Sequence, residues 1–270
     1  MIQVLFGDNL DLLKNIDSES IDLIYIDPPF NTGKTRKKTT IRTRQSDTGD
    51  RVGFKGQKFE TEELSTHAYN DQFSDFREFI EPRLLEAYRV LKNTGALYFH
   101  IDYRESHYCK ILLDEIFGRD SFLNEIIWAY DYGGRTKKKW APKHDTILYY
   151  VKNPKKYTFN IEAIDRIPYM APGLVSPEKR ALGKLPTDTW WHTIVPTNSK
   201  EKTGYPTQKP LGVLRRIIAA SSNPGDTVLD FFAGSGTTGA ACLELGRDCI
   251  LMDNNPEAIA IMKRRLGLED

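Results

Sequence analysis

The feature that most constrains the fold is a short apolar run that ends abruptly in two prolines, within residues 22–31. The run from Leu23 to Ile26 predicts a buried strand. Pro28 and Pro29 end that strand, because neither residue can donate a hydrogen bond to a strand ladder. We therefore expect a carboxylate, a rigid carbonyl and an aromatic ring at the carboxyl end of one strand. In open α/β sheets, ligands bind at this edge.

This group of residues suits a particular chemical task. An exocyclic amine of a nucleobase attacks poorly, because its lone pair is delocalised into the ring. Two acceptors around the amine, the Asp27 side chain and the Pro28 carbonyl, would localise that lone pair, and Phe30 would stack on the base. A plain turn, with a capping aspartate before two prolines, explains the same three letters equally well.

Composition sets limits on the rest. The chain has 270 residues, enough for one large domain or a domain with an insertion, and its net charge is +1. Any nucleic-acid surface must therefore be local. We find no signal-like start and no apolar run long enough to cross a bilayer, so we expect a cytoplasmic location without membrane contact. The three cysteines fit neither a disulfide framework nor a zinc site, so we expect no metal.

Two basic stretches are candidate contacts to phosphate. Residues 34–58 are basic and poor in apolar side chains, which predicts a long mobile loop with the bounds 35–66; a solvated linker is the alternative. The second lies between two β-like stretches, 122–130 and 146–151. The candidate DNA-binding side chains are Lys37, Lys38, Arg42, Arg44, Arg135, Lys137 and Lys138.

Residues 152–204 lack sustained periodicity, and prolines and aromatic residues recur among them. We expect a small irregular region that stacks on bases or contacts phosphates. A structural excursion that uses its aromatic side chains as a miniature core is an equally good explanation, also for the pair Trp190 and Trp191.

The last third of the chain carries a second strong pattern. Gly234-x-Gly236-x-x-Gly239 lies between a predicted strand and a predicted helix, and Asp253 ends the next strand. This is the dinucleotide fingerprint in its usual context, and it predicts a cofactor that contains adenosine. A nicotinamide cofactor stays possible on the pattern alone. Asp230, at the end of the preceding strand, would repel a pyrophosphate but suits a cationic sulfonium.

Taken together, three segments resemble the amino-group DNA methyltransferases that use S-adenosylmethionine: Asp27-Pro-Pro-Phe, the 230–236 loop and the 205–210 segment. The order of the motifs is similar to that of the permuted β class. The resemblance implies an α/β fold with a Rossmann-like, seven-stranded methyltransferase sheet, circularly permuted, and a small irregular target-recognition insertion. It implies a catalytic domain formed by 1–34, 67–151 and 205–270, with a target-recognition region at 152–204.

The resemblance also implies roles for single residues. The leading acid of the first motif resembles the adenine-N6 group rather than the cytosine-N4 group. The sequence has Asp253 where the family usually has Glu, and Phe30 where Tyr is more frequent. The implied catalytic residues are Asp27, Pro28, Pro29 and Phe30, and the implied cofactor-binding residues are Asp8, Thr207, Lys209, Asp230, Phe231, Phe232, Gly234, Gly236, Thr237 and Asp253.

The implied activity is methylation of adenine N6 in double-stranded DNA after the base is flipped out of the helix. Cytosine-N4 methylation and a non-catalytic DNA-binding subunit are the alternatives. A cognate restriction endonuclease and a homodimer are partners that the family suggests.

Overall fold

The computed structural model describes residues 1–31, 36–45, 51–52, 58–69, 73, 75–196 and 198–268. The chain divides into two units, one formed by Met1–Pro28 with Asp75–Asp270 and the other by Pro29–Ser74. Each unit is described by itself.

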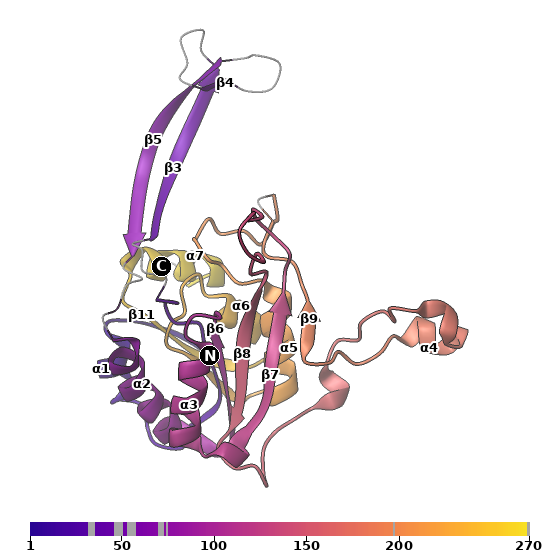
Figure 1. Ribbon diagram of the computed structural model, residues 1–270. Coiled ribbons are helices and arrows are strands. Elements are labelled where there is room, and N and C mark those ends of the chain that lie inside the picture. Colours follow the sequence, from indigo (N-terminus) through magenta and orange to yellow (C-terminus); the bar gives the residue numbers. More distant parts are fainter. Residues whose placement is uncertain are drawn as a thin grey trace. The chain divides into compact units, whose positions relative to one another are not determined.

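The first unit is built on an open, mixed sheet of eight strands among the described residues (Figure 1). In spatial order the strands are β1 (Ile2–Phe6), β11 (Asp248–Asp253), β10 (Thr227–Asp230), β2 (Ile21–Ile26), β6 (Leu91–Ile101), β8 (His144–Val151), β7 (Phe122–Ala129) and β9 (Thr189–Trp191). The first five run parallel, β8 is antiparallel to both of its neighbours, and β9 pairs in parallel with β7. The α/β sheet expected from the sequence is confirmed, and β9 adds an eighth strand to the seven expected.

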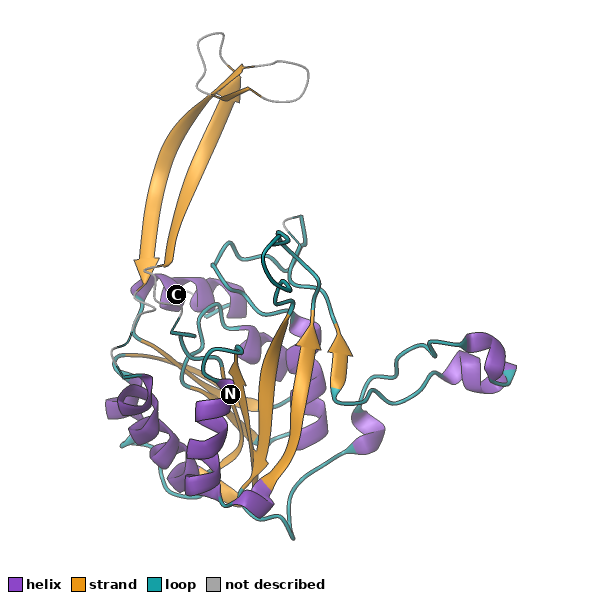
Figure 2. Ribbon diagram, in the orientation of Figure 1, coloured by secondary structure: helices purple, strands orange, loops and turns teal. Residues whose placement is uncertain are grey.

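The central strands are apolar on both faces, because helices cover both sides of the sheet. In β2 the run Leu23–Ile26 is almost completely buried, and the same holds for Ala96–Phe99 of β6. One layer contains the contacting helices α1 (Asn9–Leu13), α2 (Phe76–Val90) and α3 (Ser106–Phe117). The other contains α5 (Leu211–Ser221), α6 (Thr237–Leu245) and α7 (Pro256–Leu266) (Figure 2).

Local sequence fixes where several of these helices begin. The Asp8 side chain accepts a hydrogen bond from Leu10 N at 2.8 Å and so caps α1. Asp75 and Asn255 cap α2 and α7 in the same way, since a short acceptor side chain satisfies backbone N–H groups that have no partner within the helix. Pro256 is the first residue of α7, where the fixed φ of proline matches the helical conformation.

The second unit differs from the loop expected at 35–66. It contains an antiparallel sheet of β3 (Arg36–Gln45), β4 (Arg51–Val52) and β5 (Lys58–Tyr69), in the order β3-β5-β4. The register sets basic residues opposite acidic ones: Arg42 faces Glu62 and Arg44 faces Glu60. Opposite charges in directly paired positions favour a strand pair. The basic stretch by itself predicts a loop, because it has few apolar residues. The acidic residues that pair with it begin only at residue 60.

The stretch 152–204 stays in the first unit and is largely irregular, as expected. Besides β9 it holds the short helices η3 (Ile161–Ala163), η4 (Pro172–Leu174) and α4 (Pro177–Leu182); η2 (Arg119–Ser121) precedes β7. Figure 1 shows α4 on an extension away from the sheet. The two tryptophans differ, since Trp190 is 7% exposed and Trp191 is 75% exposed. The Trp190 indole N–H donates to the Thr187 carbonyl at 2.7 Å, so this side chain has a structural role.

Candidate active site

Four acidic side chains gather where adjacent parallel strands end. Asp8 follows β1, Asp253 ends β11, Asp230 ends β10 and Asp27 follows β2. Because these strands are parallel neighbours, their carboxyl ends lie at one edge of the sheet. The pairing of β10 with β2 thus makes neighbours of two motifs that lie about 200 positions apart in the chain.

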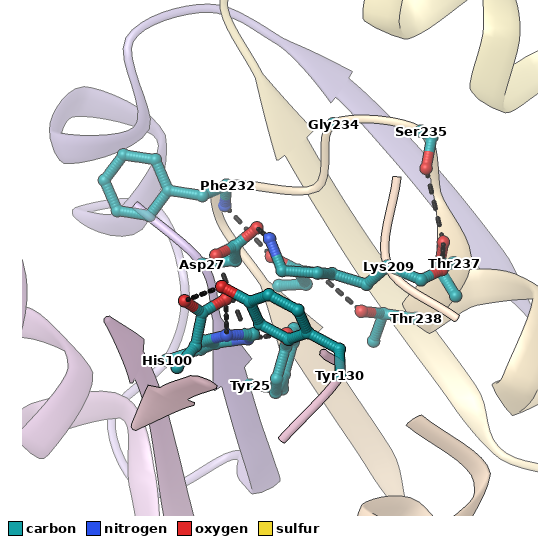
Figure 3. A network of polar contacts seen from close by, with 12 residues as sticks. Tyr25, Asp27, His100, Tyr130, Lys209, Phe232, Gly234, Ser235, Thr237 and Thr238 are labelled. Atoms are coloured by element: carbon teal, nitrogen blue, oxygen red, sulfur yellow. Dashed lines mark hydrogen bonds and ion pairs between the residues drawn. The ribbon is translucent and has the colours of Figure 1, made fainter. Parts of the chain in front are cut away.

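The two carboxylate oxygens of Asp27 have different surroundings. Its Oδ2 forms an ion pair with the Lys209 ammonium, and the two side chains are 17% and 11% exposed (Figure 3). Its Oδ1 is buried and lacks a hydrogen-bond partner among the described residues. A buried acceptor without a donor costs about 1–3 kcal/mol, so this oxygen is suited to receive a donor from a ligand. Pro28 follows directly and is buried.

Pro29 and Phe30 belong to the second unit. Stacking of Phe30 on a base therefore stays a prediction. Within its own unit, Asn31 Oδ1 accepts a hydrogen bond from the Phe73 backbone N–H at 3.0 Å. This bond joins the two ends of the second unit's chain segment.

Behind Asp27 lies a buried polar chain that the sequence analysis missed. The Tyr25 hydroxyl lies 2.7 Å from His100 Nδ1, and His100 Nε2 lies 3.3 Å from Asp145 Oδ2. The Tyr130 hydroxyl donates to Asp145 Oδ1 at 3.2 Å. The signal was available: His100 is a polar residue inside the apolar run of β6, and Tyr25 shares a strand face with Asp27.

The glycine loop between β10 and α6 closes the site. Gly236 has φ +72° and precedes α6, and a Cβ there would lie 2.7 Å from Met262 Cγ, so only glycine fits. Gly234 N donates to Asp253 Oδ2 at 2.9 Å. Asp230 accepts from Phe232 N at 3.0 Å and from the Thr238 hydroxyl at 2.5 Å. The loop is thus held in shape by the acids at both strand ends.

The electrostatics of this edge favour a cationic ligand. Burial, together with the charges of Asp27 and Asp253, raises the pKa of Asp230 to about 7, against two hydrogen bonds that lower it. Burial also raises the pKa of Asp253. Three crowded carboxyl groups would repel a pyrophosphate and attract a sulfonium or an ammonium group. This argues for S-adenosylmethionine over a nicotinamide dinucleotide.

Other predicted cofactor residues have spare bonding capacity or act through the backbone. Asp253 accepts one backbone N–H on each oxygen, from Gly234 and from Asn255 at 2.9 Å each, which leaves acceptor capacity for ribose hydroxyls. The Phe231 ring is fully buried, whereas Phe232 is partly accessible. Of these two rings, Phe232 is the one that can line a pocket.

A buried arginine ties the first turn to the glycine loop. Arg83 donates to Asn9 Oδ1 at 2.6 Å and pairs with Asp8 at 3.2 Å. Asn9 in turn donates to the Phe231 carbonyl at 2.6 Å. Burial lowers the pKa of Arg83. The Asp8 side chain is about half exposed, so it can still contact a ligand.

Lys209 is held between the Asp-Pro-Pro motif and helix α6. Its ammonium pairs with Asp27, and its carbonyl accepts from the Thr237 hydroxyl at 3.1 Å. Its role at the cofactor, which the resemblance implies, stays a prediction. Thr237 also accepts from Arg265 at 2.8 Å, so it holds the chain together at this point. Thr207 is exposed and has φ +61°, an uncommon left-handed conformation.

The expected phosphate contacts fall into two groups. Arg135, Lys137 and Lys138 lie exposed in the segment between β7 and β8, and the Trp140 side chain there is 96% exposed. Arg44 is also exposed. The side chains of Lys37, Lys38 and Arg42 lie outside the described residues.

The described part of the chain holds neither a metal centre nor a membrane span. No group of three or more histidine, cysteine or acidic side chains there is arranged to hold a metal ion. In the same part, no helix combines the length and the apolar character needed to span a bilayer.

A glycine loop and an Asp-Pro-Pro motif at one edge of an α/β sheet define a class of methyltransferases, and comparison with known proteins gives the family. The family model described as DNA methylase, of the N6/N4 methyltransferase type, matches residues 21–264. The chain belongs to this DNA methylase family.

The relatives include enzymes with established names. The chain is 34% identical over 267 residues to the Type II methyltransferase M.HpaI of Haemophilus parainfluenzae, covering 99% of this chain and 74% of that protein. It is 33% identical over 273 residues to the DNA adenine methyltransferase YhdJ of Escherichia coli, covering 98% and 82%.

Two solved structures share the fold. One is the M1.HpyAVI–SAM complex, with TM-score 0.63, 22% identity and coverage of 98% and 99% of the two chains. The other is the cytosine-N4-specific PvuII DNA methyltransferase, with TM-score 0.67, 17% identity and coverage of 98% and 86%.

Proposed function

We propose that this protein transfers a methyl group from S-adenosylmethionine to the N6 amine of adenine in double-stranded DNA, at a specific site and after base flipping. The observation that carries the proposal is Asp27 Oδ1, a buried acceptor without a donor among the described residues, on the strand next to the glycine loop. N6 is stacked inside a duplex and reaches such an acceptor only when the base leaves the helix.

The residues of the chain have distinct tasks in this mechanism. Asp27 Oδ1 and the Pro28 carbonyl accept the two amine hydrogens, which localises the nitrogen lone pair. Lys209 holds the Asp27 carboxylate in place through its ion pair with Oδ2. Asp253, which also holds the glycine loop through Gly234, would bind the ribose of the cofactor. The glycine loop would line the pocket for the rest of the cofactor. S-adenosylmethionine, when bound, supplies an electrophilic methyl group on a cationic sulfur.

The choice of adenine over cytosine depends on the leading acid of the Asp-Pro-Pro motif. One relative is named a DNA adenine methyltransferase, and it covers nearly the whole chain. The cytosine-N4-specific enzyme shares the fold at 17% identity, and the physical task is the same for either amine. Cytosine-N4 methylation is therefore the alternative that an experiment must separate.

The test uses the purified chain alone. DNA incubated with the protein and labelled cofactor is digested to nucleosides, and the labelled nucleoside is identified by mass. We expect N6-methyladenosine; a methylated cytidine would establish the alternative, and no label at all would favour a non-catalytic subunit. Mapping of the modified positions at base resolution then gives the sequence context.

The family also bears on partners and location. Several relatives, M.HpaI among them, are named Type II methyltransferases, which supports a cognate restriction endonuclease in the same cell. We further propose a cytoplasmic location, where such DNA is found, and a homodimer. Sedimentation of the purified protein over a range of concentrations tests the dimer.

DNA affinity is expected to fall steeply with salt, because lysine and arginine side chains that bind phosphates release counterions. Replacing Lys137 and Lys138 by glutamine should lower the slope of log K against log salt by about 1 for each phosphate that is no longer neutralised. The Lys37 and Lys38 double glutamine variant should do the same for the second unit. Fluorescence titrations on one duplex at several salt concentrations give the slopes, and an unchanged slope would make that segment a linker.

A further inference from the structure

The tryptophans of the chain differ sharply in exposure, and the most exposed one lies on the segment that joins β7 to β8. Trp140 is 96% exposed and Trp191 is 75% exposed, whereas Trp128 and Trp190 are buried. A large aromatic side chain normally contributes much burial to a core or an interface. The Trp140 ring contributes almost none to the core, so it is available to a ligand.

Trp140 lies at the same edge of the sheet as Asp27. β6 is the parallel neighbour of β2, and the carboxyl end of β6 pairs with the start of β8. Figure 1 shows the segment between β7 and β8 beyond the ends of these two strands. The Lys139 ammonium lies 5.9 Å from the centre of the Tyr103 ring, in the turn that follows β6. This contact places Trp140, the next residue, at the rim of the candidate active site.

The segment that carries the ring is held in shape by its own hydrogen bonds. The Lys143 ammonium donates to the Tyr132 carbonyl at 2.5 Å and to the Gly134 carbonyl at 3.0 Å. Arg135 pairs with Asp131 at 3.3 Å. A tryptophan has only two side-chain torsions and loses little conformational freedom on binding. The ring is thus presented on an ordered support.

The charge around the ring identifies the chemistry of its partner. Residues 130–143 contain five basic side chains and one acidic side chain, a net charge of +4, whereas the whole chain has +1. Basic side chains bind phosphates, and an exposed aromatic ring stacks on bases. The combination fits a nucleic acid. A second copy of the same segment would bring like charges together.

We propose that Trp140 inserts into the DNA duplex and fills the space that the target base leaves when it flips toward Asp27. Flipping opens a gap between neighbouring base pairs, and side chains that insert between base steps offset the cost of unstacking. A ring at the rim, next to side chains that bind phosphates, can reach the gap while the base occupies the pocket. The inference rests on the proposed methyl transfer for the target base, whereas stacking of Trp140 on DNA is measured without that activity.

The first test measures stacking by fluorescence. In Trp191→Phe, Trp140 is the one exposed tryptophan that remains, because the other two are buried. The probe is a duplex with one abasic position, which offers a preformed gap, compared with the intact duplex of the same sequence. We expect the gapped duplex to quench Trp140 and to shield it from acrylamide. The Trp140→Phe, Trp191→Phe double variant should show neither change. A Trp140 that stays open to acrylamide in the saturated complex would overturn the proposal.

The second test separates stacking from phosphate contacts. Trp140→Ala should weaken binding to the gapped duplex by about 5- to 150-fold, the usual range for loss of one aromatic stacking contact. The slope of log K against log salt should stay unchanged, because no charge is removed. Trp140→Phe should recover most of the affinity. Leu243→Ala is the control, since Leu243 is 52% exposed near the far end of α6 from the glycine loop. Unchanged affinity in Trp140→Ala would contradict insertion.

The third test asks which base the ring serves. Single-turnover methylation by Trp140→Ala is compared on a fully paired duplex and on one with the target base in a mismatch, where flipping costs less. We expect the loss of rate relative to wild type to be smaller on the mismatched duplex. An equal loss on both would mean that Trp140 stacks on the flipped base itself, and would refute insertion into the gap. Protein that stacks Trp140 on DNA but methylates no base would refute the proposed function and leave this inference intact.

Discussion

Replacing Asp27 by asparagine is expected to slow methyl transfer by about 10²–10³-fold, the usual cost of removing one preorganised polar group from a reacting centre. Asparagine keeps one acceptor but loses the negative charge beside the amine, where positive charge develops. It also leaves the Lys209 ammonium without its carboxylate partner in a nearly buried position. Asp27→Ala removes both carboxylate oxygens and should abolish transfer.

The measurement separates chemistry from binding. Single-turnover transfer of labelled methyl gives the rate, and calorimetry gives the cofactor dissociation constant. This dissociation constant should stay close to the wild-type value in both variants. Asp22→Asn is a matched control on the same strand, since Asp22 pairs with Lys92 at 2.8 Å at the opposite end of β2. Turnover close to that of wild type in Asp27→Ala would refute the amine-orienting role.

The second large effect concerns Asp230 and the pH dependence of stability. The pKa of this carboxyl is about 7 in the folded protein and 3.8 in the reference state. The folded state therefore holds one more proton than the unfolded state between these values. The free energy of unfolding loses up to about 4 kcal/mol from this group as pH rises from about 4 to 8. The contribution is fully present at low pH and is lost as pH passes about 7.

Asp230→Asn should remove this loss, because an amide cannot ionise. Urea unfolding at fixed pH between about 5 and 8.5 is expected to show the variant gaining stability relative to wild type as pH rises. Thr238→Val removes a hydrogen bond that lowers the pKa of Asp230, so its loss of stability should extend to higher pH. Parallel curves for wild type and Asp230→Asn would mean that Asp230 is already ionised in the folded state.

Some of the site could be predicted because its signals are local. The strand before Asp27 ends at prolines that cannot continue a ladder, and Gly236 takes a backbone conformation that a side chain would disfavour. The acidic residue at the end of each of these strands can likewise be recognised from the apolar run that precedes it. Such features depend on a few neighbouring residues, so sequence reasoning finds them.

Other features depended on partners far along the chain. The strands β3 and β5 were not predicted, since the acidic residues that face the basic ones lie about 20 positions later. The family resemblance implies a cofactor role for Lys209 but gives no sign of its ion pair with Asp27. That ion pair joins residues 182 positions apart.

The sequence by itself determined which chemical groups stand at the strand ends: a carboxylate before two prolines, a glycine loop and a second acid. Only the tertiary structure decided that β2 lies beside β10, and that His100, which pairs with Asp145, lies next to Asp27. The physical reason is that strand pairing and the direction of buried hydrogen bonds are fixed by contacts between distant segments. Local propensity sets the elements, whereas the shared burial of their apolar faces sets which of them meet.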